Sequence, residues 1–365
     1  MRKSNIELMR VVLFVMVVAI HVGAPYLSSH NVSGVLNWQF ANLLDGGSRI
    51  AVDCFVLLTG YFLSSSKDPK PARQIVRVLS PVAFYMLLYL PLFYLDSSGN
   101  LVRALSTAAV DLLSNSIYFY HLWYTQVLII LYLLSPYMNV LVSELPKERL
   151  RNLILVLYCV ASVIPSIVYA TGVQFYDLGL LNSRLTLFVL LYLVGAYVRK
   201  HLLTKASAKG LFSLFVLADM MVVALSFVYN SRYSPLIFFA KQRGVEMTYP
   251  LGGFSGAFYE FNNSLVIVVA VLMLLAFLQI RIPGSQVINR IGGLTYGAYV
   301  VHVFWITVLS RFVNPFAASE SPRYPLVAVL LILSVAACSL ATESLRQMVV
   351  HLVSVWRGKP SNTQA

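Results

Sequence analysis

The sequence predicts an all-α fold, a polytopic membrane helical bundle of about ten transmembrane helices with both termini in the cytoplasm. Hydrophobic residues make up 59% of the 365 residues and charged residues only 11%, which is too apolar for a soluble domain of this size. The apolar residues gather in runs long enough to cross a bilayer, which takes about 20 residues as a helix. Basic residues are distributed unevenly between these runs.

Ten apolar runs predict the spans. The first begins with basic residues, as a signal peptide does, but it carries Glu7 and Arg10 and has no obvious small-x-small cleavage site. We therefore expect it to be retained as the first helix. The second and sixth runs are short. The predicted spans lie near residues 6–27, 48–64, 78–95, 117–142, 153–170, 185–198, 211–229, 263–280, 294–310 and 324–341.

The distribution of positive charge predicts the orientation of the bundle. A cytoplasmic N-terminus assigns 18 of the 27 lysines and arginines to the inner segments, 8 to the outer segments and Arg10 to the first span. This asymmetry follows the positive-inside rule. It predicts that both termini are cytoplasmic.

We expect a single transmembrane domain, residues 1–345, followed by a cytoplasmic tail, residues 346–365. The net charge of +13 is scattered between apolar runs and forms no single basic face, which argues against nucleic acid as a partner. Cys54, Cys159 and Cys338 lie inside apolar runs at unrelated spacings, so they predict neither a disulfide framework nor a metal site.

The first span carries ionisable residues that a simple membrane anchor would lack. Arg10 and His21 are separated by about three helical turns, which places both on one helix face and roughly 16 Å apart along the axis. Glu7 shares that face and can pair with Arg10. An ionisable group inside a membrane indicates function, although His21 could also be a packing residue bonded to another helix. We favour a functional role for His21.

Two pairs of charged residues follow. Arg49 and Asp53 are four positions apart at the start of the second span, so they can neutralise each other or belong to a site. Arg73 and Arg77 end the inner segment 65–77, and their spacing suits the binding of one phosphate group or of the headgroup of a membrane lipid. Retention of positive charge for topology is the alternative for these two arginines.

The outer half of the chain adds further candidates. His121 lies at the outer end of the fourth span, next to aromatic residues typical of an interfacial belt, and would face inward if it has a role. The largest outer loop, residues 230–262, contains Glu260 among aromatic and charged residues and is long enough to be functional. Tyr299 and His302 share one face of the ninth span near mid-membrane.

Five short motifs occur in order among the spans. They are Asn5-Ile6-Glu7-Leu8-Met9-Arg10 with His21, Val52-Asp53-Cys54-Phe55-Val56-Leu57-Leu58-Thr59-Gly60-Tyr61, Arg73 and Arg77 ahead of Pro81, His121-Leu122-Trp123-Tyr124, and Thr295-Tyr296-Gly297-Ala298-Tyr299 with His302. In this order they make the chain resemble, over nearly its whole length, the acyltransferase-3 family of integral-membrane enzymes that O-acylate cell-envelope sugars in bacteria. Thr59 stands where that family more often has serine, and the spacing from Arg77 to Pro81 is one residue longer than its common form.

The resemblance implies an activity and its reactants. The donor would be cytoplasmic acyl-CoA, usually acetyl-CoA, acting as a co-substrate with no permanently bound cofactor. The acceptor would be a hydroxyl of an envelope polysaccharide or lipid-linked saccharide, and the location would be the bacterial inner membrane. The residues that the family needs correspond to Arg10, His21, Arg73 and Arg77 in this sequence.

These expectations lead to a hypothesis for the site. The donor phosphates would bind Arg73, Arg77 and Arg10, because a buried phosphate needs compensating charge. The thioester would reach His21, which would act as general base on the sugar hydroxyl or be acylated transiently.

Other residues would support this histidine and the acceptor. Asp53 or His121, if they converge on His21, would fix its tautomer. Glu260, Tyr299 and His302 are the candidates for binding the acceptor.

Two other classes of function share some of these features. A lipid-linked saccharide transporter would also have about ten spans with buried charges, but it would be expected to show an internal repeat or broken helices. A glycan polymerase or ligase would place its catalytic groups on the large outer loop, for which Arg232, Arg243 and Glu260 are candidates. A purely structural membrane subunit is disfavoured by Arg10 and His21 sharing one face.

Overall fold

The computed structural model of the protein describes residues 3–29, 36–66, 70–171, 183–202, 206–242, 258, 260–313 and 322–356, and all regular secondary structure in these ranges is helical. The elements are α1 (Ser4–Ser29), α2 (Leu36–Gly46), α3 (Ile50–Leu63), α4 (Pro71–Asp96), α5 (Leu101–Ser114), the 3₁₀ turn η2 (Tyr120–Leu122), α6 (Trp123–Glu144), α7 (Lys147–Tyr158), the π turn η3 (Cys159–Val163), α8 (Ile164–Thr171), α9 (Arg184–His201), α10 (Ala208–Gln242), α12 (Ser264–Gln279), α13 (Gln286–Leu309) and α14 (Tyr324–Trp356). The predicted all-α fold is therefore confirmed.

Each of the ten predicted spans overlaps a helix. Eight helical segments in the described part of the chain are long and apolar enough to cross a membrane. The other two spans correspond to α9, which carries three basic residues in its 18, and to α12, which has only 16 residues. The protein is a multi-pass helical bundle, while the number of crossings and the side on which each terminus lies stay predictions.

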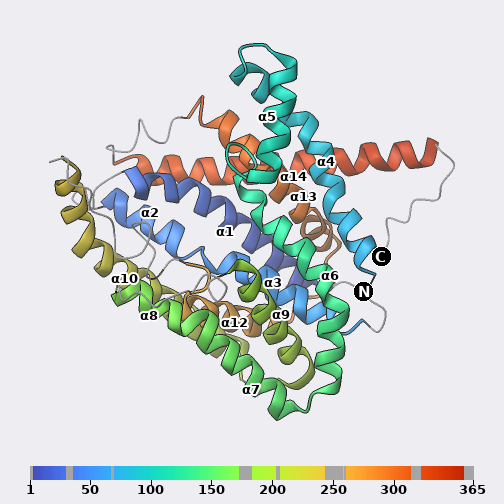
Figure 1. The fold of residues 1–365 in the computed structure, drawn as a ribbon, viewed down its shortest axis with the longest axis vertical. Helices are drawn as coiled ribbons and strands as arrows, with labels where there is room; N and C mark the ends of the chain where they lie inside the picture. Colours follow the sequence, from blue (N-terminus) through green and yellow to red (C-terminus); the bar gives the residue numbers. More distant parts are fainter. Residues whose placement is uncertain are drawn as a thin grey trace.

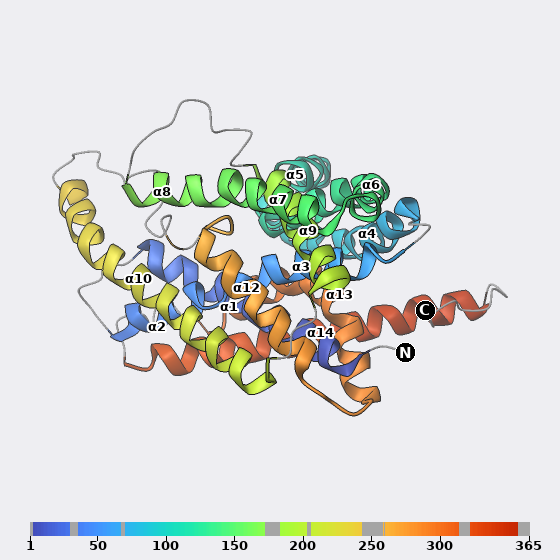
Figure 2. The same cartoon turned by 90° about the horizontal axis from the view of Figure 1, so that it is seen from below.

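The centre of the bundle is formed by α1 and α13, which lie side by side (Figures 1 and 2). Because α1 also contacts α2, α3, α12 and α14, nearly every side of this helix is covered by protein. Met9, Leu13, Phe14 and Val18 are fully buried as a result. The ionisable residues of α1 therefore face other helices.

The closest helix packing joins α3 to α9. A Cβ atom at Gly60 would collide with the backbone of Tyr192, and one at Gly195 would collide with the backbone of Leu57. Small residues that let two backbones approach in this way are typical of helix pairs in membranes, where packing replaces the hydrophobic effect. These two glycines fix the position of α3.

The polar residues between the first two apolar runs predict an outer loop over residues 28–47, but residues 36–46 form the helix α2. Asn37, Asn42 and Asp45 are buried against neighbouring helices, and the Asn42 side chain donates to the backbone oxygen of Val223 on α10 at 3.1 Å. A hydropathy profile scores such residues as polar and therefore predicts a loop. It contains no information on the polar partners from other helices that make their burial possible.

Two other predicted connections are partly helical. The inner segment 65–77 overlaps α4, which starts at Pro71 because proline is well suited to the first turn of a helix. The first residues of the predicted outer loop 230–262 belong to α10, which continues to Gln242. Arg73 and Arg77 consequently lie in the first two turns of a helix.

The boundary expected between residues 345 and 346 falls inside α14. This helix runs from Tyr324 to Trp356 without interruption. Arg346 donates two hydrogen bonds of 2.7 Å to Glu343, and the Tyr85 hydroxyl of α4 donates to the same carboxylate at 2.8 Å. The end of the chain thus begins as part of the bundle, and α1 begins on the same side on which α14 ends (Figure 1).

Candidate active site

Three histidines from three separate elements meet inside the bundle. His21 is on α1, His121 is on η2 and His302 is on α13. The ring centroid of His302 lies 5.1 Å from that of His21 and 5.0 Å from that of His121. The fold therefore brings together three predicted site residues that are far apart in the sequence, and we call them the histidine cluster.

His302 is held in one tautomer by its own helix. Its Nδ1 atom lies 2.5 Å from the backbone oxygen of Tyr299, one turn earlier. Because a carbonyl oxygen only accepts, Nδ1 must carry the proton, and in the neutral ring Nε2 then has the lone pair. Nε2 is buried and has no hydrogen-bond partner among the described residues. The ring therefore presents an unused proton acceptor inside the bundle.

His121 is held by α13 through both its ring and its backbone. Its Nε2 atom lies 3.0 Å from the backbone oxygen of Val300, to which it donates. The Tyr299 hydroxyl donates in return to the backbone oxygen of His121. Only 2% of His121 is exposed. These reciprocal bonds fix η2 against α13 at the level of His302.

His21 is the most accessible member of the histidine cluster. It is half-buried, whereas the other two are buried. Its ring makes an edge contact with Tyr120, with the centroids 5.2 Å apart, so it points into the protein and not into lipid. Among the three, His21 is the residue that keeps some exposed surface.

A positive charge also lies within electrostatic range of His21. It belongs to Arg49, at the start of α3. Arg49 donates to Asp45 at 2.9 Å, and its guanidinium lies over the ring of Phe261, 5.5 Å from the centroid. The pairing of Arg49 with Asp53 that spacing allowed is therefore not the one formed, because the carboxylate one turn earlier holds the guanidinium.

Asp53 is fully buried in α3, and neither of its carboxylate oxygens has a hydrogen-bond partner among the described residues. The expected convergence of this carboxylate on His21 is thus not seen as a hydrogen bond. The structure instead places the ring of Tyr120 against His21 and the charge of Arg49 within electrostatic range of it. Tyr120 was not among the predicted site residues, although it is next to the predicted His121, whereas Arg49 was a site candidate only as the alternative to its pairing with Asp53.

The predicted donor-binding arginines lie on α1 and α4. Arg10 pairs with Glu7 at 3.0 Å and keeps 34% of its side chain exposed, while Glu7 is buried against Gly292. Arg73 and Arg77 are exposed. The half-buried Tyr132 of α6 lies within electrostatic range of both Arg10 and Arg77. Two of the three arginines therefore exert their charge on the same tyrosine.

From Tyr132, further tyrosines continue toward the histidine cluster. Tyr132 is within electrostatic range of Tyr124 and Tyr296. The ring of Tyr299 lies 5.6 Å from Tyr124 and 6.1 Å from Tyr296. Tyr299 in turn stacks on His302 at 5.6 Å. We call Tyr132, Tyr124, Tyr296 and Tyr299 the tyrosine path.

The tyrosine path offers polar groups along an otherwise apolar interior. The hydroxyl of Tyr296 donates to the backbone oxygen of Val78 at 3.2 Å and lies 3.3 Å from the Thr125 hydroxyl. Phenol rings combine apolar faces with a hydroxyl that can bond to an amide. Such a lining suits a molecule that is long, thin and moderately polar.

Glu260 is exposed at the end of the large outer loop. Most of that loop, residues 243–257 with Arg243, lies outside the described residues, as does the side chain of Arg232. Glu260 therefore remains a candidate on its exposure alone.

Among the described residues no group of three metal-ligating side chains is close enough to hold a metal ion.

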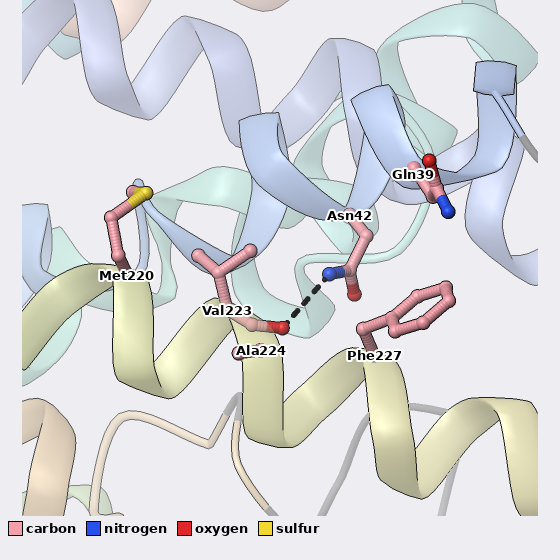
Figure 3. A pocket seen from close by; sticks show the side chains of 6 residues that line it. All are labelled: Gln39, Asn42, Met220, Val223, Ala224 and Phe227. Carbon is pink, nitrogen blue, oxygen red and sulfur yellow. Dashed lines mark hydrogen bonds between the residues drawn. The ribbon is translucent and has the colours of Figure 1, made fainter.

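A groove of about 230 Å³ opens between α2 and α10 (Figure 3), but no predicted site residue lines it. Its walls are mainly apolar, and Asn42 bridges the two helices within it. Its lining residues are Gln39, Asn42, Met220, Val223, Ala224 and Phe227.

The fold and this site define a multi-pass membrane protein with a histidine cluster inside its helical bundle. The family model described as "Acyltransferase domain" (Acyl_transf_3) matches residues 3–343. The chain therefore belongs to the acyltransferase-3 family and is a membrane acyltransferase, which confirms the resemblance found in its motifs. No curated protein and no solved structure matches the chain significantly.

Proposed function

We propose that the protein is an O-acyltransferase that moves an acyl group, acetyl in the simplest case, from cytoplasmic acyl-CoA to a hydroxyl of an envelope polysaccharide or lipid-linked saccharide at the bacterial inner membrane. One observation carries the proposal: the tyrosine path runs from Tyr132, which lies within electrostatic range of Arg10 and Arg77, to Tyr299, which stacks on His302 of the histidine cluster. This arrangement matches a donor that is charged at one end and reactive at the other.

The donor would bind from the arginine end. Its phosphates would contact Arg73, Arg77 and Arg10, because guanidinium groups bind phosphate oxygens with two parallel hydrogen bonds. The pantetheine arm would lie along the tyrosine path, where its amides find phenol hydroxyls and its methylenes find ring faces. The thioester would then lie beside the histidine cluster.

The transfer itself needs one proton acceptor that later becomes a proton donor. His21 would take the proton of the acceptor hydroxyl as that oxygen attacks the thioester carbonyl. Collapse of the tetrahedral intermediate breaks the carbon–sulfur bond, and the protonated His21 would return its proton to the thiolate. The products are the acyl ester and free CoA, so no proton is gained or lost.

His302, His121 and Arg49 would support this step. His302 lies against His21, and its Nε2 atom has no hydrogen-bond partner among the described residues, so it could share or relay the proton. Arg49 supplies positive charge near His21, which would stabilise the oxyanion of the intermediate. Tyr299 would contact donor and acceptor where the two meet.

The acceptor would approach from the other end of the bundle. Tyr120 and Arg49 border His21 there, and Glu260 is exposed on the loop before α12. A carboxylate next to aromatic rings is a common way to bind the hydroxyls and faces of a sugar. We assign acceptor binding to this end.

The test uses the purified full-length protein in liposomes. Acetyl-CoA is supplied with a lipid-linked saccharide fraction, and both thiol release and the mass of the saccharide are followed. The proposal expects thiol release that depends on the saccharide and a matching acetyl group on it. Acyl-CoA that neither binds nor loses its acyl group, with any saccharide fraction of the source membrane, would overturn it.

A further inference from the structure

The segment that delivers Tyr120 and His121 to the histidine cluster is built around one carboxylate. This segment, residues 115–119, joins α5 to η2. Asn115 ends α5 in the left-handed conformation, with φ 53°. The chain then turns back, so that consecutive backbone N–H groups point at the last turns of α5.

Asp111 receives these N–H groups. Its Oδ1 atom accepts from the backbone N–H groups of Ser116 at 2.7 Å and Ile117 at 2.5 Å, and its Oδ2 atom accepts from those of Tyr118 at 2.8 Å and Phe119 at 3.0 Å. The Ser116 hydroxyl adds a fifth bond at 2.9 Å. The carboxylate is 1% exposed. Four successive N–H groups around one anion form a concave site of the kind that binds anions tightly.

The surrounding contacts hold α5 in a single position. The Asn115 side chain donates to Gln126 on α6 at 2.8 Å, and Gln126 donates to the backbone oxygen of Leu112 at 3.1 Å. The Tyr118 hydroxyl donates to Asp96 at the end of α4 at 2.6 Å. The carboxylate is therefore fixed relative to α4 and α6 as well as to the segment that it binds.

We propose that Asp111 is a positioning residue for acyl transfer, because it fixes the backbone immediately before Tyr120 and His121. Tyr120 contacts His21, and His121 contacts His302. A change in this backbone would therefore displace two side chains at the proposed site of acyl transfer. The inference rests on the proposed function for its kinetic consequence. Its structural consequence, the placement of His121, is independent of the substrate.

The structure explains why a carboxylate is needed at this place. An amide in its position would turn an NH₂ group toward backbone donors, and alanine would leave four N–H groups without their acceptor, which is costly above all for the buried Phe119. Misplacement of a catalytic group by about 1 Å lowers a rate by about 100-fold. The kinetic effect should therefore be on the chemical step and not on donor binding.

The experiment compares Asp111→Asn and Asp111→Ala with Asp96→Asn, which removes a carboxylate on α4 that bonds to the same segment only through the Tyr118 hydroxyl. We expect kcat to fall roughly 10- to 100-fold in the Asp111 variants, with an unchanged KM for acetyl-CoA. Asp96→Asn should retain kcat within about threefold, since an exposed bond contributes little. If Asp111→Ala is not recovered folded, Asp111→Asn decides.

A second measurement separates this inference from the proposed function. Diethyl pyrocarbonate modifies accessible histidines, and mass spectrometry locates the modified ring. His121 should be protected in the wild type and in Asp96→Asn, and it should be modified faster in both Asp111 variants. Unchanged protection together with an unchanged kcat would overturn the role of Asp111. A wild type without transferase activity, combined with faster modification of His121, would count against the function alone.

Discussion

The two ends of the tyrosine path differ in how the protein holds their side chains. At the histidine end, the rings of His121 and His302 bond to backbone carbonyls and are almost fully buried. At the arginine end, Arg73 and Arg77 are exposed on the first turns of α4. The contrast indicates that the two ends have different roles. The histidine end fixes the geometry of the reacting groups, whereas the arginine end is open to a charged molecule from water.

This difference predicts different kinetic signatures. A group that acts only in the transition state changes kcat, whereas one that binds the donor equally in both states changes KM. Variants at the histidine end should therefore lower kcat, and variants at the arginine end should raise the KM for acyl-CoA. The predictions below are ordered by the size of the expected effect.

The largest effect is expected from His21→Ala. Loss of a general base costs roughly 10²- to 10⁴-fold in rate, so acyl transfer should fall by that factor while donor binding is retained. Saccharide acetylation and acyl-CoA binding are measured in parallel. His351→Ala is the matched control, because His351 is exposed on α14. Normal acylation by His21→Ala would remove the central assignment and with it the contrast between the ends.

The double variant Arg73→Ala with Arg77→Ala comes second. A hydrogen bond to a charged group contributes about 1.5–3 kcal/mol, and solvent around the two exposed arginines keeps their combined contribution near that of one such bond, so the KM for acetyl-CoA should rise by roughly 10- to 100-fold and kcat should change much less. Arg103→Ala removes an exposed arginine on α5 and serves as the control. An unchanged KM in the double variant would move the phosphate site to another part of the protein.

A milder change at the arginine end is Gly292→Ala. The new Cβ would collide with the side chain and backbone of Glu7, so the Glu7–Arg10 pair must shift. We expect a loss of about 1–3 kcal/mol of unfolding free energy and a raised donor KM, with kcat of the folded fraction preserved. Gly284→Ala is the control, since no atom lies within 4 Å of its Cβ position. A pure loss of kcat would contradict the division between the ends.

The smallest effect concerns acid pH and Asp111. Burial acts to raise the pKa of this carboxyl, but the N–H groups of residues 117–119 and the Ser116 hydroxyl together hold the pKa below its ordinary value. The stability that Asp111 contributes is therefore complete above the unfolded-state pKa of about 3.9 and is lost as the pH falls through the lower folded-state value.

The measurement compares melting temperatures of the wild type and Asp111→Asn as the pH falls. The difference should be constant from neutral pH down to about pH 4 and should shrink below it. The neighbouring titratable groups are Tyr118 and Tyr89, and Asp96 and Arg311 act on Tyr118. A difference that grows on acidification would contradict the assigned direction.

The sequence predicted the helical bundle well because hydropathy measures the property that decides it. Each long apolar run became a helix, since a chain in hydrocarbon must satisfy its backbone internally. The prediction failed at α2, where Asn42 and Asp45 are buried polar residues with partners on other helices or one turn away. Those partners depend on the tertiary fold, which a hydropathy profile does not contain.

The site was predictable in composition but not in arrangement. His21, His121, Tyr299 and His302 were all identified singly, and the structure brings them together. Their distances depend on how α1, η2 and α13 pack, and no local spacing encodes that. The ion-pair partner of Arg49 could not be predicted from the sequence for a different reason. Asp45 and Asp53 lie four residues before and four residues after it, and spacing alone does not choose between them.

Asp111 was missed for a third reason. Its partners are five to eight residues further along and depend on the turn at Asn115. In the sequence, nothing distinguishes a single aspartate between two predicted spans from a solvated charge. Its role is visible only in the structure, where the backbone of residues 116–119 turns back and donates hydrogen bonds to it.

The continuity of α14 matters to anyone who shortens the gene. A stop codon after position 345 would follow the predicted end of the transmembrane domain. It would, however, remove Arg346, whose guanidinium pairs with the Glu343 carboxylate. An almost fully enclosed carboxylate would then remain pressed against Gly297 with the Tyr85 phenol as its companion. Trimmed versions should keep every residue through Trp356.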